Sequence, residues 1–393
     1  MSNLNLTQAH DQWSSRPDDE RFWTLEEMHN QTLAYCLNSE EVEMEASDCK
    51  LFETDRGISM RTGTGPDDSA EVSHYAFTQV CRQLGAPPSY LRQLPNRLVV
   101  DCLETARTSM GHDDRSRNLL LDMTYSDRPL LRATTSSRYV RVWNHRLVEQ
   151  LMGLKSEGWI VPPARPSGNT ESERTRIATD ADCVDFGASP LTVKPGDEIA
   201  PAGLYASNHD MFAFMIHPDI VIENGLSPAG MRRGTMIRQS EVGACSIWKL
   251  DFLFDTVCGN HIVWNAKDVK ETRVIHKGNS VEDNWLAMVS SITEEAQMSA
   301  SDQEADIRRA QELVIAKGKD AMIELLFKKR WTSKRDAASA YDLAAENRHA
   351  HGNPDSAWGI VSGLTLLSQK SGHADGRAKM DQAAGKILAT CLN

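Results

Sequence analysis

Apolar residues recur with different spacings along the chain, and the spacings predict different elements. Between Ser69 and Met110 they return every three or four positions, which predicts helices, and Gly85 with the two prolines after it ends the first of these. Between Asp182 and Trp264, apolar runs alternate with short polar turns, which predicts antiparallel hairpins. Helical spacing returns after Glu282 and continues toward the C-terminus.

This pattern divides the chain into three regions. We expect an acidic N-terminal segment over residues 1–70, an α+β core domain over residues 71–290 and a C-terminal helical region over residues 291–393. Short strands are also expected between Asn118 and Val142. The predicted fold class is therefore α+β, with an antiparallel β-sheet core built of hairpins, flanked by helices and followed by the C-terminal helical region.

The composition is that of a globular chain. Hydrophobic residues make up 40% of the 393 positions, which is enough to bury a sizeable core. No apolar run approaches the ~20 residues that cross a bilayer, and the N-terminus lacks the basic-then-apolar order of a secretory signal. Eight cysteines are scattered without a C-x-x-C pair, which suits free thiols in a reducing compartment. We therefore expect a soluble cytoplasmic protein with no membrane partner.

The net charge of −12 is unevenly distributed. Residues 1–70 carry 15 acidic against 5 basic side chains, whereas residues 71–150 carry 8 against 11. A local basic patch, and not the total charge, decides whether a polyanion can bind. The acidic N-terminal segment has two interpretations. It can be a solvated face that keeps the chain in solution, or an arm that mimics nucleic acid or contacts a protein partner.

Positive and aromatic side chains are interleaved on the predicted strands. Arg and Lys side chains on a twisted sheet beside aromatic rings can hold a phosphate backbone and stack bases. The candidate nucleic-acid contacts are Arg128, Arg132, Arg138, Arg141, Arg232, Arg233, Arg238, Lys249, Tyr139 and Trp248. The alternative interpretation is that the cations neutralise nearby acids and that the aromatic rings belong to the core.

Candidate catalytic and metal sites are weak in this sequence. His209 and His217 are spaced such that an extended strand, rising ~3.3 Å per residue, places them ~26 Å apart, too far to share an ion. The pair Ser240 and Glu241 lies in a predicted turn without a positioned histidine or an oxyanion hole. The phosphate-loop pattern G-x-x-x-x-G-K-[ST] does not occur. We therefore expect a non-enzymatic protein without a cofactor or a metal.

One long segment carries a family resemblance. From Gly234 it contains a strand, the turn Gln239-Ser240-Glu241-Val242-Gly243, a second strand, Val257-Cys258-Gly259-Asn260-His261 and, later, His276-Lys277-Gly278. This order resembles domain-of-unknown-function family 932, the phage/plasmid-like proteins, with Asn-Ser-Glu-Val-Gly, Val-Cys-x-Asn-Gly and His-x-Gly at these places. Gln239 and His261 depart from that pattern. Residues 76–94, 131–151 and 356–388 resemble further family segments.

The resemblance implies a protein of a phage, plasmid or integrative element, acting in the cytoplasm of a host cell. Members of the family often lie beside replication and recombination genes. The strand and helix order is also similar, at the level of fold analogy, to that of single-strand annealing proteins. We expect a homo-oligomer that binds or anneals single-stranded nucleic acid in recombination or replication. The alternative is a non-enzymatic accessory or anti-defence protein that binds a host protein through its acidic N-terminal segment.

Overall fold

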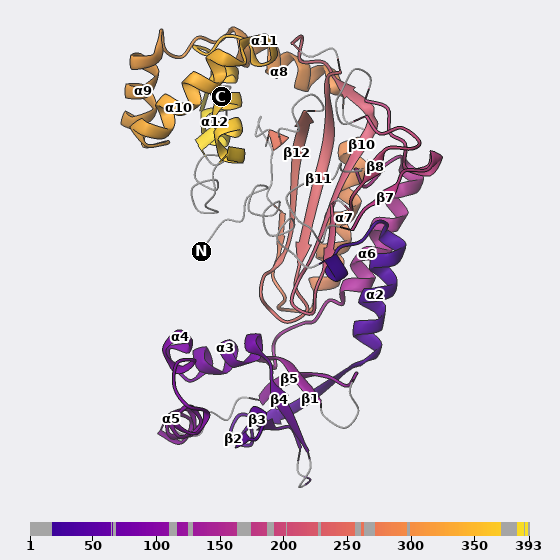
Figure 1. Ribbon diagram of the computed structural model, residues 1–393, viewed down its shortest axis with the longest axis vertical. Coiled ribbons are helices and arrows are strands. Elements are labelled where there is room, and N and C mark those ends of the chain that lie inside the picture. Colours follow the sequence, from indigo (N-terminus) through magenta and orange to yellow (C-terminus); the bar gives the residue numbers. More distant parts are fainter. Residues whose placement is uncertain are drawn as a thin grey trace.

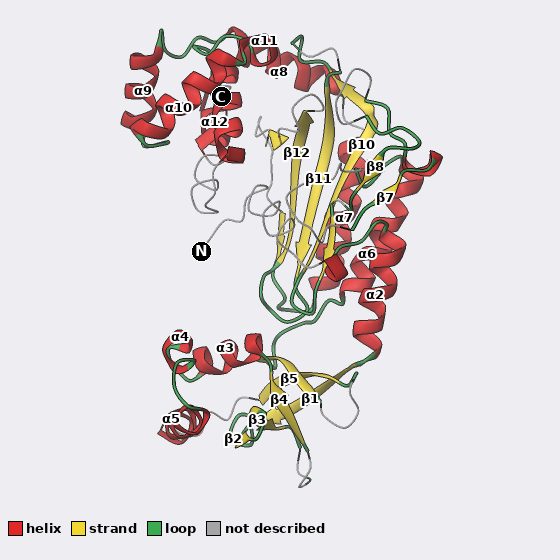
Figure 2. Cartoon of the chain, in the orientation of Figure 1, coloured by secondary structure: helices red, strands yellow, loops and turns green. Residues whose placement is uncertain are grey.

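The fold is α+β, as predicted from the sequence (Figures 1 and 2). It divides into a small-sheet lobe (residues 39–136), a large-sheet lobe (residues 18–38 and 137–296) and a C-terminal helical lobe (residues 299–391). The computed structural model describes residues 18–63, 65, 68–109, 116–124, 129–162, 174–186, 192–201, 203–226, 229–255, 261–262, 272–296, 299–370, 383–388 and 390–391. Within these ranges no helix combines the length and apolar character needed to span a bilayer.

The small-sheet lobe is one six-stranded sheet with the strand order β1-β5-β6-β4-β3-β2. Its strands are β1 (Ser39–Glu45), β2 (Leu51–Thr54), β3 (Gly57–Arg61), β4 (Ser69–Val72), β5 (Ser116–Asp122) and β6 (Leu130–Ser136). All neighbouring strands are antiparallel except β4 and β6. Helices α3 (His74–Gln83), α4 (Pro88–Leu91) and α5 (Asn96–Ser109) share one hydrophobic core with the sheet.

The described part of the acidic N-terminal segment belongs to the two sheet lobes. Its residues 39–61 form β1, β2 and β3, and the predicted boundary at residue 70 falls inside β4. In β1, glutamates alternate with Val42 and Met44, which pack on the lobe's core while the glutamates lie on the exposed side. This two-residue period is that of a half-buried edge strand, and β1 holds four of the 15 acidic side chains of residues 1–70.

The large-sheet lobe contains the predicted antiparallel hairpins. Its sheet has the order β13-β12-β11-β10-β9, and β14 also pairs with β12. The strands are β9 (Leu204–Ala206), β10 (Met211–Ile222), β11 (Met231–Gln239), β12 (Ile247–Asp255), β13 (His261–Ile262) and β14 (Thr272–Val274). Beside this sheet, β7 (Arg176–Ile177) and β8 (Glu198–Ile199) form a separate two-stranded ladder, and the short 3-10 helices are η1 (Asp18–Glu20), η2 (Leu154–Glu157) and η3 (Asp180–Asp182).

Three helices from distant parts of the chain cover one face of the large sheet. They are α2 (Leu25–Leu37), α6 (Asn144–Gly153) and α7 (Val281–Ala296), and they bury one core with the strands. Helices α2 and α6 lie side by side (Figure 1) although the whole small-sheet lobe separates them in sequence. The small-sheet lobe is therefore an insertion into the large-sheet lobe. Helix α7 runs through the predicted boundary at residue 290 and belongs to the large-sheet lobe.

The C-terminal helical lobe packs on one end of the large sheet. Its helices are α8 (Ala300–Glu312), α9 (Lys319–Lys328), α10 (Lys334–Glu346), α11 (Arg348–His351) and α12 (Ala357–Lys370). Their core includes Trp358 and Leu326 and reaches Ile222 and Met231 of the large sheet. Helices α10 and α12 approach closely at Gly363, where an added Cβ atom would lie 2.1 Å from the Ala340 carbonyl oxygen.

Candidate functional site

Most of the predicted nucleic-acid contacts lie inside the protein. A carboxylate neutralises four of the cations, and each of these cationic side chains is at most 12% exposed. The pairs are Arg132–Glu241, Arg141–Glu41, Arg238–Asp210 and Lys249–Asp251, with nitrogen–oxygen distances of 3.0, 3.3, 2.9 and 2.9 Å. In the Arg132–Glu241 and Arg238–Asp210 pairs the carboxylate is buried as well, so a phosphate could reach the cation only by breaking a desolvated pair, which is costly.

Two further cations hold the end of the large sheet together. Arg232 donates through Nε to the Pro218 carbonyl at 2.6 Å and through Nη1 to the Ala229 carbonyl at 2.7 Å. Burial lowers the pKa of Arg232. Arg233 donates through Nε to Oε1 of Gln303, on α8, at 3.0 Å. Both side chains are therefore structural donors that connect strands and helices in the interior.

The aromatic candidates also serve the structure. Trp248 is buried in an aromatic cluster on the large sheet with Phe212, Phe214 and Phe252. Tyr139 is half-buried, and its hydroxyl donates to the Ser240 carbonyl at 2.8 Å. Of the predicted residues, Arg138 alone is exposed among those described, and Arg128 lies outside the described residues. Buried ion pairs and hydrogen bonds thus replace the exposed basic sheet surface expected from the sequence, and Arg138 is the predicted cation that stays exposed among the described residues.

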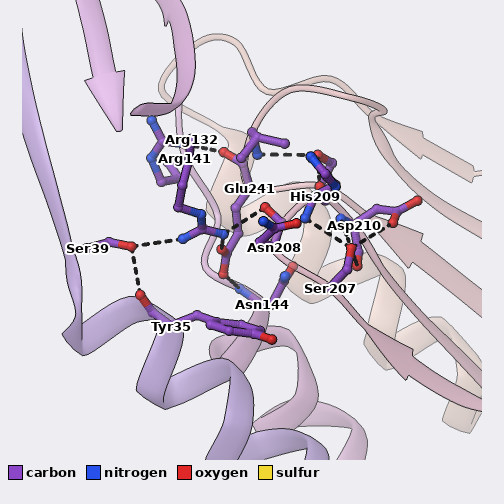
Figure 3. A network of polar contacts seen from close by, with 12 residues as sticks. Tyr35, Ser39, Arg132, Arg141, Asn144, Ser207, Asn208, His209, Asp210 and Glu241 are labelled. Atoms are coloured by element: carbon purple, nitrogen blue, oxygen red, sulfur yellow. Dashed lines mark hydrogen bonds and ion pairs between the residues drawn. The ribbon is translucent and has the colours of Figure 1, made fainter. Parts of the chain in front are cut away.

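Arg132 and Arg141 meet Glu241 where the two sheet lobes join (Figure 3). Glu241 lies in the turn between β11 and β12. Its Oε2 accepts from Arg132 at 3.0 Å, and its Oε1 accepts from the backbone N–H of Asn144 at 2.7 Å. Arg132, on β6 of the small-sheet lobe, also donates to Ser39 Oγ at 2.8 Å and to the Asn208 carbonyl at 2.9 Å. One carboxylate thereby connects the two lobes.

Apolar and aromatic contacts complete this junction. Val242 follows Glu241 and packs against Leu120 and Ala133 of the small-sheet lobe. Its carbonyl accepts from Gln79 Nε2 at 2.8 Å. The Gln239-to-Gly243 turn and the His276-Lys277 pair, both quoted for the family resemblance, meet here on either side of Tyr139. These two quoted elements therefore share one place in the structure, whereas residues 257–260 of the quoted cysteine stretch lie outside the described residues. The resemblance itself stays a prediction.

A different basic surface, which the sequence analysis did not single out, lies on the C-terminal helical lobe. We call it the basic helix surface, and its seven cations are all exposed: Lys317, Lys319, Lys328, Lys329, Arg330, Lys334 and Arg335. Between residues 317 and 335 the only acids are Asp320 and Glu324. The sequence contains the signal for this surface in the stretch Phe327-Lys-Lys-Arg-Trp-Thr-Ser-Lys-Arg335. The sequence analysis missed it because it considered only the spacing of apolar residues in this region.

The basic helix surface keeps most of its charge available. Lys319 pairs with Asp342 at 2.7 Å, and Lys334 pairs with Glu324. The other five cations form no ion pair with a described residue. An aromatic ring lies among them, because Phe327 is 49% exposed and the Lys334 ammonium lies 4.9 Å from its centroid. The surface therefore combines free cations with an accessible ring.

The described residues offer little for covalent or metal chemistry. They contain no group of three or more His, Cys, Asp or Glu side chains that could hold a metal ion. Ser240 is buried, and its Oγ donates to the His209 carbonyl at 2.5 Å. Burial raises the pKa of Cys49, Cys81 and Cys245 to about 11, so these thiols are protonated at neutral pH.

Comparison with known proteins adds no relative. No family model, no curated protein and no solved structure matches this chain. The functional argument therefore rests on the exposed and buried groups described above.

Proposed function

We propose that the protein binds single-stranded nucleic acid through the basic helix surface, as a non-enzymatic factor of a mobile element. The observation that carries the proposal is the density of exposed cations, seven within residues 317–335, on a chain whose net charge is −12. The clustered cations make this lobe locally attractive to a polyanion although the chain as a whole is acidic.

The position of the cations supports an anionic partner. Lys334 and Arg335 occupy the first turn of α10, directly after its N-cap residue Ser333. Cations at this end of a helix are repelled by the partial positive charge of the helix dipole, which costs stability. Asp336 in the same turn offsets part of that repulsion, and a phosphate bound beside Lys334 and Arg335 would offset more of it. Phe327 beside these residues provides a face on which a base can stack.

Fluorescence anisotropy with a labelled single-stranded oligonucleotide tests the proposal. The test variant reverses Lys328, Lys329 and Arg335 to Glu. A control variant with the same net charge reverses three exposed cations elsewhere, and these are Lys50, Arg97 and Lys194. The test variant should lose most of the affinity. Its plot of log affinity against log salt should also become shallower by about 2, because about 0.7 counterions are released for each phosphate contact.

Two outcomes would contradict the proposal. One is the absence of binding by the unmodified protein at low salt and micromolar concentration. The other is an equal loss of affinity in the test and control variants, which would show that only the net charge matters. A competing duplex of the same sequence distinguishes single-strand from duplex binding. Sedimentation of the protein with and without the oligonucleotide tests the expected homo-oligomer.

The alternative role, binding of a host protein by the acidic segment, stays a prediction. The structure shows which part of this segment could make the contact. Strand β1 is an edge of the small sheet, and its Glu40 and Glu43 are exposed. A partner with a basic segment would suit this edge. Capture of such a partner from host lysate should be lost in a Glu40→Lys/Glu43→Lys variant and kept in the Lys328/Lys329/Arg335 variant. The opposite pattern would favour the nucleic-acid role.

A further inference from the structure

A hollow of about 300 Å³ opens at the junction of the two sheet lobes. Three segments that are distant in sequence line it: the end of β6 with the loop after it, the turn between β11 and β12, and the residues after β14. The side chains that matter below are Ser136, Arg138, Tyr139, Ser246, His276 and Lys277. The hollow is separate from the basic helix surface, which lies on the C-terminal helical lobe.

The charged side chains among the described residues that line the hollow are both positive. Arg138 and Lys277 are both exposed, and neither forms an ion pair with a described residue. No described residue of the lining carries a carboxylate. This differs from the neighbouring Arg141, which is buried and paired with Glu41 at 3.3 Å. Two cations at one hollow in an acidic protein repel each other unless an anion lies between them.

The floor of the hollow is held in one arrangement. The rings of Tyr139 and His276 stack with centroids 4.9 Å apart, and the Tyr139 hydroxyl is fixed by its bond to Ser240. The backbones of Val140 and His276 are also joined, by an N–H to carbonyl bond of 3.0 Å. A site with fixed walls loses little conformational entropy when it binds a ligand.

The chemistry of the lining favours binding over reaction. Burial lowers the pKa of His276, so its ring is neutral at pH 7, and Nδ1 is bonded to the Val140 carbonyl at 3.0 Å. Its buried Nε2, beside the backbone of Cys245, makes no well-directed hydrogen bond within the described chain. Burial raises the pKa of the Cys245 thiol to about 11, so a thiolate nucleophile is absent at neutral pH.

We propose that this hollow binds the phosphoryl group of a small ligand between Arg138 and Lys277. A guanidinium, an ammonium and the hydroxyls of Ser136 and Ser246 supply donors for the several oxygens of a phosphate dianion, whereas a carboxylate has only two oxygens. The volume is at the lower end of the range for small-molecule sites. It suits inorganic phosphate or a phosphate monoester of nucleotide size.

The bound phosphoryl group connects the two sheet lobes. Ser136 ends β6 of the small-sheet lobe, whereas Lys277 follows β14 of the large-sheet lobe. A ligand held by both sides adds a contact to the same junction that Arg132 and Glu241 hold from within. Ligand binding should therefore slow proteolytic cleavage of the linker between β6 and α6.

Calorimetric titration of the full chain tests the site with three probes. These are inorganic phosphate, a nucleoside 5′-monophosphate and the same nucleoside without phosphate. Phosphate and the monophosphate should bind, and the nucleoside should not; the tighter of the first two identifies the source of the phosphoryl group. The Arg138→Ala/Lys277→Ala variant should lose about 100-fold in affinity, about 10-fold for each charged donor removed. The Lys50→Ala/Arg97→Ala control should bind as the unmodified protein does.

A second variant guards against a local folding defect. Ser136→Asp replaces an exposed residue at a strand end and adds a negative charge beside the two cations. It should abolish phosphate binding while leaving thermal unfolding unchanged. Equal affinity of the nucleoside and its monophosphate, or equal affinity of the Arg138/Lys277 variant and its control, would overturn the assignment. The Lys328/Lys329/Arg335 variant should still bind phosphate, so this site and the nucleic-acid proposal fail or succeed separately.

Discussion

Replacing Glu241 by Ala should be among the most destabilising single changes in the molecule. The Glu241 and Arg132 side chains are 1% and 2% exposed, so the substitution leaves a guanidinium charge in the interior without its counterion. Breaking a buried pair from one side costs about 3–5 kcal/mol of unfolding free energy. The Asn144 N–H also loses its acceptor, whereas the bonds from Arg132 to Ser39 and Asn208 persist. We expect a loss of about 4 kcal/mol.

The Arg146–Glu282 pair is the matched control. Its carboxylate side chain is 53% exposed and its guanidinium 47% exposed, so Glu282→Ala should cost at most about 1 kcal/mol. Urea unfolding followed by tryptophan fluorescence measures both changes. The double substitution Arg132→Met/Glu241→Leu removes both charges and should recover most of the lost stability.

The junction argument also predicts where the damage occurs. Limited proteolysis of Glu241→Ala should cleave first in the linker between β6 and α6, because the pair connects the lobes on either side of it. The reasoning is refuted if Glu241→Ala is no less stable than Glu282→Ala. It is also refuted if the double substitution is as unstable as the single one, because an uncompensated charge would then not be the cause.

Three further outcomes follow from the structure. Burial lowers the pKa of His276 below its ordinary value, so the unfolded chain takes up the proton first and the free energy of unfolding should fall as the pH drops below about 6.5. The His276→Asn variant should flatten this pH dependence, measured as the urea concentration at the unfolding midpoint. Gly363→Ala should lower the melting temperature because its Cβ would meet the Ala340 carbonyl, whereas Gly153→Ala, with open space around its Cβ, should be neutral or stabilising. At pH about 8, iodoacetamide should modify Cys102 first, since it is the exposed cysteine among those described; faster labelling of a buried thiol, read by mass spectrometry, would contradict the packing.

Local patterns predicted the large sheet well and the small sheet poorly. The hairpins around β11 could be predicted because apolar strands and polar turns alternate within about 45 residues. The small sheet instead pairs β1 with β5 across most of the lobe, and β4 with β6 in parallel. Its strands β2 and β4 have only four residues each. Such non-local pairing of short, polar strands leaves little periodic signal in the sequence.

At the candidate site, the sequence alone could not identify the tertiary partners of the charged residues. The sequence displays the charge of Arg132 but not its partner, which lies 109 positions away in a turn of another sheet. The alternation of side chains along a strand also could not show which cations face solvent. Both faces of β11 are buried, so an arginine on this strand is buried whichever face it lies on. The basic helix surface, in contrast, could have been recognised from the sequence of residues 327–335. Its cations there are consecutive or nearly so, and no tertiary contact is needed to see that they cluster.

The inserted position of the small-sheet lobe has a consequence for synthesis of the chain. Helix α2 leaves the ribosome more than 100 residues before its packing partner α6, a delay of about 5–20 s at ordinary elongation rates. During this interval the apolar side of α2 has no partner, while residues 39–136 can complete their own sheet. Closing so long a loop costs about 4 kcal/mol of chain entropy unless the insert is already compact. Early folding of the small-sheet lobe therefore shortens the search by which α2 reaches α6.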